Sequence, residues 1–241
     1  MKYKLFFLLI VFSISINYAQ NISGKVTYVV SMEPFSDKWI DSISKNNPIN
    51  NAKMNAWAKN RLKNTPDVEA YLVFKNGEAL YKLEEEMQND GRPDFNINRI
   101  FAGGVNKYYK NTNTKEFFFE NNLGELLLTD IAPKEWQITQ ESKQIGDYVC
   151  FKAIDLSNKK KTTFVWFTPQ IPVSFGPLDY NGLPGLVILV EMKKRTISAS
   201  KIVLNPKKEI KIEKPTKGRK ETIEEYNKRV SVFIKFLHEK D

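Results

Sequence analysis

A succession of short strand-like segments constrains the fold of this chain more than any other feature. Each segment alternates or runs apolar over the length of a strand. They are residues 22–30, 70–74, 79–83, 115–119, 125–128, 148–156, 162–168, 186–192 and 196–204. Because most links between them are short, antiparallel pairing is favoured over parallel pairing, which needs long crossovers. The sequence therefore predicts a mainly β fold, built as a curved antiparallel sheet or half-barrel.

Two turns support this pairing. Asn76 and Gly77 stand between two of the segments, and both residue types tolerate the positive φ of a two-residue hairpin loop. Residues 121–124 similarly link the segment that holds Phe117 and Phe119 to the next one. Each link predicts a hairpin.

Two other segments have helical periodicity. Residues 51–63 precede the stop signal Thr65-Pro66. Residues 222–238 carry an apolar stripe at three- and four-residue steps, formed by Ile223, Tyr226, Val230, Phe233, Ile234 and Leu237. An uncovered stripe is unfavourable in water, so this amphipathic C-terminal helix is expected to pack on the β domain. The alternative is that it binds a partner.

The N-terminus predicts export. Lys2 and Lys4 precede an apolar run that ends at Phe12, and Ala19 follows at a cleavage position, which is the order of a secretory signal peptide. A membrane anchor is the alternative, but the run is shorter than the roughly 20 residues of a span. No cysteine follows directly, so we expect a soluble periplasmic or extracellular protein that is not a lipoprotein.

The expected organisation has three parts: a signal peptide at 1–19, a single antiparallel β-rich domain at 20–213, and a linker with the C-terminal helix at 214–241. The formal net charge of +9 points, in an exported protein, to lipid head groups or anionic glycans rather than nucleic acid. The single cysteine, Cys150, cannot form an intramolecular disulfide and is expected to be buried. The oligomeric state stays open.

Catalytic motifs are missing. The only histidine, His238, stands near the C-terminus, which excludes a histidine triad and a multi-histidine zinc site. No nucleophile elbow, phosphate-binding loop or paired-cysteine motif is present. We therefore expect no enzyme, metal or cofactor. The remaining enzymatic alternative uses Asp179, Tyr180 and Glu191, and it requires two carboxyl groups roughly 5 to 9.5 Å apart in a cleft.

The most informative segment is 135–204. Proline and glycine are dense between the apolar segments at 162–168 and 186–192, and they favour a rigid, irregular connection. Its residues include Gly176-Pro177 and Gly182-Leu183-Pro184-Gly185-Leu186, with Val187 next. Trp136, the stretch 145–153 and Trp166-Phe167-Thr168 accompany them.

This segment resembles the signature of the GLPGLI family of exported Bacteroidota proteins. The resemblance covers about a third of the chain closely and implies no catalytic residue, because the family has no established activity. A Bacteroidota origin also makes Asp41-Ser42-Ile43 similar to that phylum's O-glycosylation acceptor pattern.

Two functions follow as expectations. The first is a non-enzymatic envelope protein that binds a lipid or another apolar or amphipathic ligand on the curved sheet, lined by Trp136, Trp166, Phe117, Phe119 and Tyr148. The second is an accessory of outer-membrane uptake or secretion that contacts an outer-membrane protein through the loop of Gly176, Pro177, Gly182, Leu183, Pro184, Gly185 and Leu186. Structural alternatives remain for both, since the aromatic residues could be plain core and the loop a structural corner.

Overall fold

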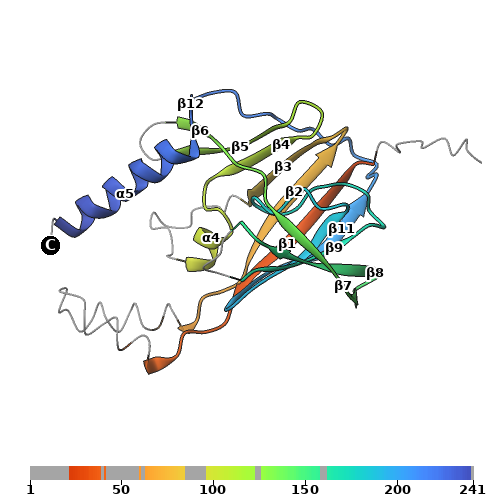
Figure 1. The fold of residues 1–241 in the computed structure, drawn as a ribbon, viewed down its shortest axis with the longest axis horizontal. Coiled ribbons are helices and arrows are strands. Elements are labelled where there is room, and N and C mark those ends of the chain that lie inside the picture. The colour runs from red at the N-terminus through yellow and green to blue at the C-terminus, as the bar shows by residue number, and fades with distance from the viewer. Residues whose placement is uncertain are drawn as a thin grey trace, which may run out of the picture.

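A computed structural model describes residues 22–38, 41, 60, 63–84, 96–122, 126–157 and 162–239. Within these residues it contains one large sheet and two helices that are described over their whole length (Figure 1). The strands are β1 (Gly24–Met32), β2 (Val68–Lys75), β3 (Glu78–Leu83), β4 (Lys107–Asn111), β5 (Glu116–Asn122), β6 (Leu126–Asp130), β7 (Trp136–Ile145), β8 (Tyr148–Asp155), β9 (Phe164–Thr168), β10 (Leu186–Met192), β11 (Arg195–Leu204) and β12 (Arg219–Glu221). The helices are α4 (Ile97–Phe101) and α5 (Ile223–Glu239).

The sheet consists of two meanders joined edge to edge. Its order is β12-β6-β5-β4-β3-β2-β1-β11-β10-β9-β8-β7, so β1–β6 form one meander and β7–β11 the other. The antiparallel pair β1–β11 joins them. Among the strands of the described residues, the short β12 alone pairs in parallel, with β6. The prediction of a mainly β fold with a curved sheet is confirmed, and the pairing is mixed rather than wholly antiparallel.

Most predicted strands are present within one or two residues of the expected bounds. Asn76 and Gly77 form the expected hairpin turn, with φ of 53° and 80°. The sequence missed β4, β7 and β12. The predicted signal peptide, nearly all of the predicted helix at 51–63 and most of the Asp41-Ser42-Ile43 pattern lie outside the described residues.

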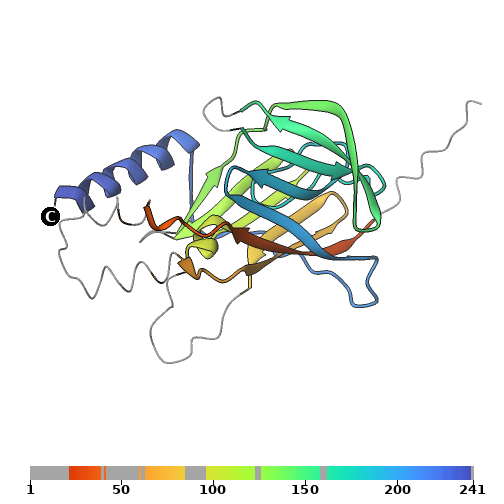
Figure 2. The same ribbon diagram turned by 90° about the horizontal axis from the view of Figure 1, so that it is seen from below.

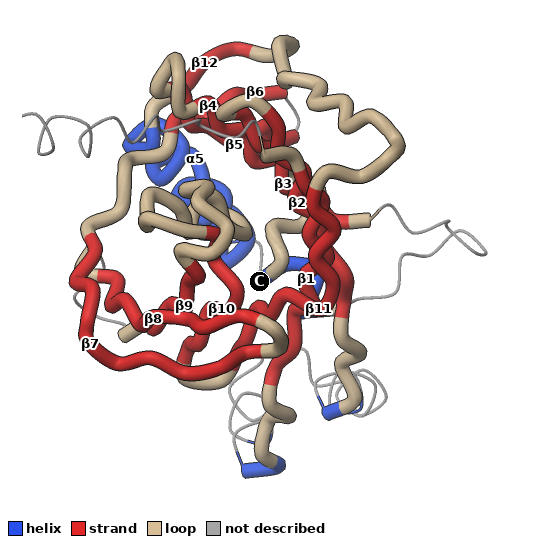
Figure 3. The backbone as a smooth tube through the Cα atoms, turned by 90° about the vertical axis from the view of Figure 1, so that its right-hand side faces the viewer, coloured by secondary structure: helices blue, strands red, loops and turns tan. Residues whose placement is uncertain are grey.

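The sheet curves around a centre that the chain itself fills (Figure 3). Inward-facing side chains of β1–β3 and β8–β10 belong to one apolar cluster. Residues 169–185, which we call the Gly-Pro connection, join β9 to β10 and contribute Ile171, Phe175 and Leu183 to the same cluster. The connection therefore occupies the inner face of the sheet. Cys150 is fully buried there, as expected, and burial raises its thiol pKa to about 11.

A second apolar cluster lies on the opposite, outer face of the first meander. Leu80, Tyr109, Phe118 and Leu128 form it, one each from β3, β4, β5 and β6. Residues 205–220, which we call the strap, cross this face after β11, and Ile212 of the strap packs on the cluster. The strap ends in β12 beside β6.

Helix α5 leaves the sheet at the end that holds β5, β6 and β12 (Figures 1 and 2). The ring of Tyr226 meets Phe119 edge to face, with centroids 5.2 Å apart. Arg229 donates to the buried Glu221 of β12 at 2.7 Å, and Glu221 also accepts from Thr129. The first turns of the helix are thus anchored to the sheet by one aromatic contact and one buried ion pair.

Candidate functional site

The Gly-Pro connection is fixed by hydrogen bonds along its length. Within it, the Gly182 amide donates to the Ser174 carbonyl at 3.1 Å. Three side chains from distant strands bind the connection or the adjacent start of β10. The Trp136 indole donates to the Asn181 carbonyl at 2.8 Å, the Lys110 ammonium donates to the Ser174 carbonyl at 2.7 Å, and the Tyr28 hydroxyl donates to the Val187 carbonyl, just beyond the connection, at 2.6 Å. These contacts hold the connection in one shape.

At two positions of the motif, neighbouring backbone lies so close that only glycine fits. A Cβ at Gly185 would lie 2.2 Å from the Thr168 carbonyl oxygen, and one at Gly176 would lie 2.2 Å from the Tyr180 carbonyl oxygen. Gly182 differs, because its surroundings are open and its φ of +88° is the constraint. At Gly176 and Gly185 the neighbouring backbone therefore leaves no room for a side chain.

The motif residues alternate between the core and the surface. Leu183 and Leu186 are 1% and 0% exposed, whereas Gly182 and Pro184 are exposed. The inner side of the motif belongs to the core, and its outer side is open to solvent. Pro177, also in the predicted loop set, is buried.

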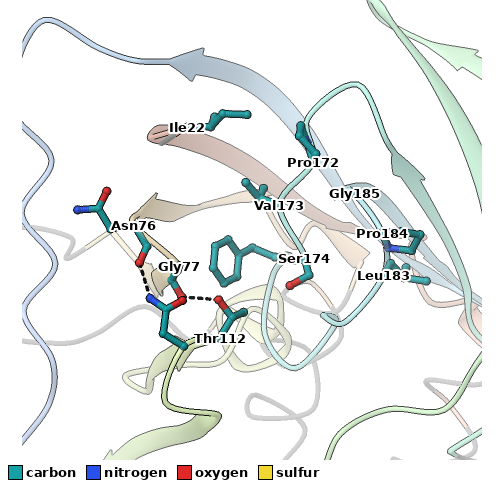
Figure 4. A pocket seen from close by; sticks show the side chains of 12 residues that line it. Ile22, Asn76, Gly77, Thr112, Pro172, Val173, Ser174, Leu183, Pro184 and Gly185 are labelled. Carbon is teal, nitrogen blue, oxygen red and sulfur yellow. Dashed lines mark hydrogen bonds between the residues drawn. The ribbon is translucent and has the colours of Figure 1, made fainter. Parts of the chain in front are cut away.

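The outer side of the motif forms one wall of a groove of about 680 Å³, which we call the motif groove (Figure 4). The connection supplies residues 172–175 and 183–185, and the hairpin turns supply Asn76, Gly77, Thr112 and Asn113, with Ile22 at the side. The Thr112 hydroxyl donates to the Gly77 carbonyl at 3.0 Å, and the Asn113 amide donates to the Asn76 carbonyl at 2.9 Å. Of the described residues that line the groove, none is charged.

Lys110 lies directly behind this wall. Its ammonium is 5.4 Å from the centre of the Phe175 ring and 5.5 Å from that of Phe117, in addition to its hydrogen bond to Ser174. Burial lowers the pKa of Lys110 to about 7. Sequence patterns missed this residue, since β4 was not predicted and a lysine in a basic chain gives no sign of burial.

A second cavity, of about 940 Å³, lies at the opposite end of β10. It is lined by Asp179, Tyr180 and Glu191, the three candidates for a carboxylate enzyme, together with Lys134 and Asp155. The Lys134 ammonium lies 2.9 Å from Asp155 and 3.0 Å from Asp179, so the two carboxylates are within about 6 Å of each other. Glu191 accepts from the Trp166 indole at 2.6 Å.

The electrostatics of Asp155 oppose a role for this carboxyl group as a general acid. Although burial acts to raise the pKa of Asp155, hydrogen bonding and the charge of Lys134 bring that pKa below its usual value. A glycosidase of this carboxylate spacing needs one carboxyl group with a raised pKa. Asp155 and Asp179 are better explained as structural partners of Lys134, which links β8 to the connection through two ion pairs, than as a catalytic pair.

The five aromatic residues predicted to line a ligand site do not gather at one surface. Trp136 binds the connection, and Phe117 lies beside Lys110. Phe119 stacks on Tyr108 with centroids 5.4 Å apart, Trp166 lies beneath the ammonium of Lys143, and Tyr148 packs at the edge of the inner cluster. None of the five is among the described residues that line either cavity. Their role in ligand binding stays a prediction.

The described part of the chain contains no group of three or more histidine, cysteine or acidic residues placed to hold a metal ion. No helix within the same residues has the length and apolar character needed to cross a membrane.

Part of the chain matches an uncharacterised protein family, and its fold is similar to that of solved β-rich structures. Residues 154–189 match the family described as "Protein of unknown function (Porph_ging)", and this stretch contains β9 and the whole Gly-Pro connection. No curated protein matches. Two solved structures of PNGF-II are similar: that in space group P21 has a TM-score of 0.53 and 17% identity, and that in C2 has 0.51 and 18%.

Each PNGF-II alignment covers 86% of this chain and 32% of the PNGF-II chain. The present chain therefore spans about a third of the length of these proteins. At such low identity the similarity shows the fold alone.

Proposed function

We propose that this chain is a non-enzymatic exported envelope protein of the GLPGLI type, which binds an apolar or amphipathic ligand in the motif groove. The observation that carries the proposal is the position of the motif. Its inner side is fixed in the core, and on its outer side the exposed Pro184 lines the wall of an uncharged groove. The GLPGL sequence at residues 182–186 lies within the stretch that matches the uncharacterised family.

The chemistry of the groove favours a ligand that is apolar along much of its length. Pro172, Val173 and Pro184 provide apolar surface, and the amides and hydroxyl at the two hairpin turns provide neutral hydrogen-bonding groups. A volume of about 680 Å³ is in the range of small-molecule sites, which combine apolar walls with a few polar groups. The Gly-Pro connection occupies the inner face of the sheet, so we place the ligand in the groove rather than on the strands.

A second function uses the same surface. Pro172 and Pro184 are both exposed on the connection, and proline presents an apolar face at little entropic cost on binding. A segment of an outer-membrane protein could occupy the groove in place of a small molecule. This is the accessory function in uptake or secretion.

The test is native mass spectrometry of the exported chain purified from envelope extract, followed by lipid extraction. We expect a stoichiometric small molecule on the wild type, and its loss from Pro184→Asp, which places a charge on the apolar wall. The matched control is Pro169→Asp, because Pro169 is exposed on the same connection but does not line the groove.

The outcomes separate the two functions. A bare protein mass, together with capture of an outer-membrane protein that Pro184→Asp abolishes, refutes the small-molecule function and supports the accessory function. A ligand retained by a folded Pro184→Asp variant refutes the groove as the site.

A further inference from the structure

The strap concentrates the positive charge of the chain. Its residues 205–220 contain seven basic side chains and two acidic ones, a net charge of +5 out of +9 for the whole chain. The basic residues are Lys207, Lys208, Lys211, Lys214, Lys217, Arg219 and Lys220. More than half of the net charge thus lies in one short segment, so the basic residues are clustered rather than spread evenly along the chain.

The strap is held against the sheet at three-residue steps. Glu209 binds Lys75 of β2 at 3.0 Å, Ile212 packs on the outer apolar cluster, and Pro215 is buried. Gly218 follows, where a Cβ would lie 2.6 Å from the Leu126 carbonyl oxygen, and then the buried Glu221. The sheet-facing positions therefore recur with a period of three.

This period and the path of the strap indicate an extended chain. Between β11 and β6 the strap crosses six strand separations, roughly 29 Å. An α-helix from residue 205 to residue 219, with 14 steps of about 1.5 Å, would reach only about 21 Å. A period of three is also that of extended polyproline-like backbone.

Lysines occupy a second set of positions with the same period. One of them, Lys214, also reaches the sheet, where its ammonium lies 5.5 Å from the centre of the Tyr109 ring. Lys208, Lys211, Lys214, Lys217 and Lys220 recur at every third position, and all five are exposed. Successive members lie at least roughly 6 Å apart, which is the average over the path of the strap, and at most roughly 9 to 10 Å, which is the length of three fully extended residues. We call these five residues the lysine row.

Most of the lysine row lacks a compensating charge. Lys214 pairs with Glu116 at 2.7 Å, and Glu116 also attracts Lys220. For Lys208, Lys211 and Lys217, no carboxylate in the part of the chain that the structure describes forms an ion pair. The row thus presents separate positive charges along a line rather than over an area.

We propose that the lysine row binds a linear acidic polysaccharide along the strap. A line of separated charges matches a polymer that carries acidic groups at intervals, such as one carboxylate on every second sugar. A bilayer surface would be matched better by a patch that extends in two dimensions. The proposal concerns the outer face of the sheet and does not depend on the motif groove.

The test measures binding of the full exported chain to labelled hyaluronan, which carries one carboxylate on every second sugar, by fluorescence anisotropy over a range of salt concentrations. The variant replaces Lys208, Lys211 and Lys217 with glutamine. The control replaces Lys193, Lys194 and Lys201, which are exposed, lie outside the strap and remove the same charge. Circular dichroism melting checks that both variants fold.

We expect the wild type to bind hyaluronan with an affinity that falls as salt rises, because released counterions and screening govern such contacts. The strap variant should bind on the order of tenfold more weakly at low salt and show a shallower salt dependence, whereas the control should bind nearly as well as the wild type. Equal losses in both variants would overturn the proposal in favour of net charge alone. Equal binding to neutral dextran, or tighter binding to phosphatidylglycerol vesicles than to hyaluronan, would also overturn it.

Discussion

Two glycines of the same motif should respond very differently to alanine. At Gly185 the added Cβ would lie 2.2 Å from the Thr168 carbonyl oxygen and 2.5 Å from its carbon. These are backbone atoms at the end of β9, paired with Leu186 of β10, so no side chain can rotate away. The strand end itself must move. Overpacking of this kind costs about 1 to 3 kcal/mol and more where the backbone is fixed, so we expect at least about 3 kcal/mol.

At Gly182 the space is open, since the nearest atom is 3.7 Å from the added Cβ. Only the φ of +88° opposes alanine, at a cost of roughly 1 to 2 kcal/mol. The lower entropy of the unfolded alanine chain offsets about 0.4 to 1 kcal/mol of that cost. We expect a net loss of about 1 kcal/mol for Gly182→Ala.

Urea unfolding separates the two values. With a slope of about 2 kcal/mol per M, Gly185→Ala should lower the midpoint by about 1.5 M and Gly182→Ala by about 0.5 M, at unchanged slope. Gly176→Ala repeats the test at an independent close approach and should resemble Gly185→Ala. If Gly182→Ala were as destabilising as Gly185→Ala, close backbone approach would not explain the glycines of this motif.

Three further results are expected. Because burial lowers the pKa of Lys110 from 10.5 to about 7, the unfolded chain binds more protons than the folded one between these values, and stability should rise with pH across that window. Titration of unfolding against pH should lose this rise in Lys110→Met, and an unchanged rise would contradict the assignment. Leu183→Ala should cost about 2 to 5 kcal/mol in urea unfolding, against less than about 0.5 kcal/mol for the exposed Pro184→Ala, and similar costs would refute the inner and outer division of the motif. Arg229→Gln should leave Glu221 without its ion-pair partner and increase amide exchange in the first turns of α5. It should also remove the stability that the wild type loses below about pH 4.5, where Glu221 becomes protonated. Unchanged exchange would show that Tyr226 alone anchors the helix.

Most strands that the sequence predicted have one face, or both, buried; β11, in which only Ile197 is buried, is the exception. Strand β7 was missed because it is an edge strand without a buried face: all ten of its residues are exposed or half-buried. Strand β4 is short, and its apolar residues are two tyrosines between lysines and an asparagine. Strand β12 has three residues, too few for any periodicity. The parallel pairing of β12 depends on where the strap ends, which is a property of the whole sheet.

The candidate site was predictable on one side only. The density of proline and glycine marked the Gly-Pro connection as a rigid structure, and the connection indeed has one fixed path. The opposite wall of the motif groove comes from two hairpin turns more than 50 residues away in the chain, and their position follows from the register of β2–β5. The burial of Lys110 and the shared contact of Lys134 with two aspartates are likewise tertiary properties, because a lysine has the same local pattern whether it is solvated or enclosed.

The two sides of the GLPGL motif carry different kinds of information about function. The core and β9 determine which residues can stand at Leu183, Gly185 and Leu186. Folding would therefore require these residue types even if the chain bound no ligand. Gly182 and Pro184 make no comparable contact with the core, and Pro184 belongs to the groove wall. A substitution at Pro184 that leaves stability unchanged is therefore the clean test of function, because any effect it has on binding cannot arise through the fold. Substitutions at the inner positions would change binding and stability together and would not distinguish a structural corner from a binding site.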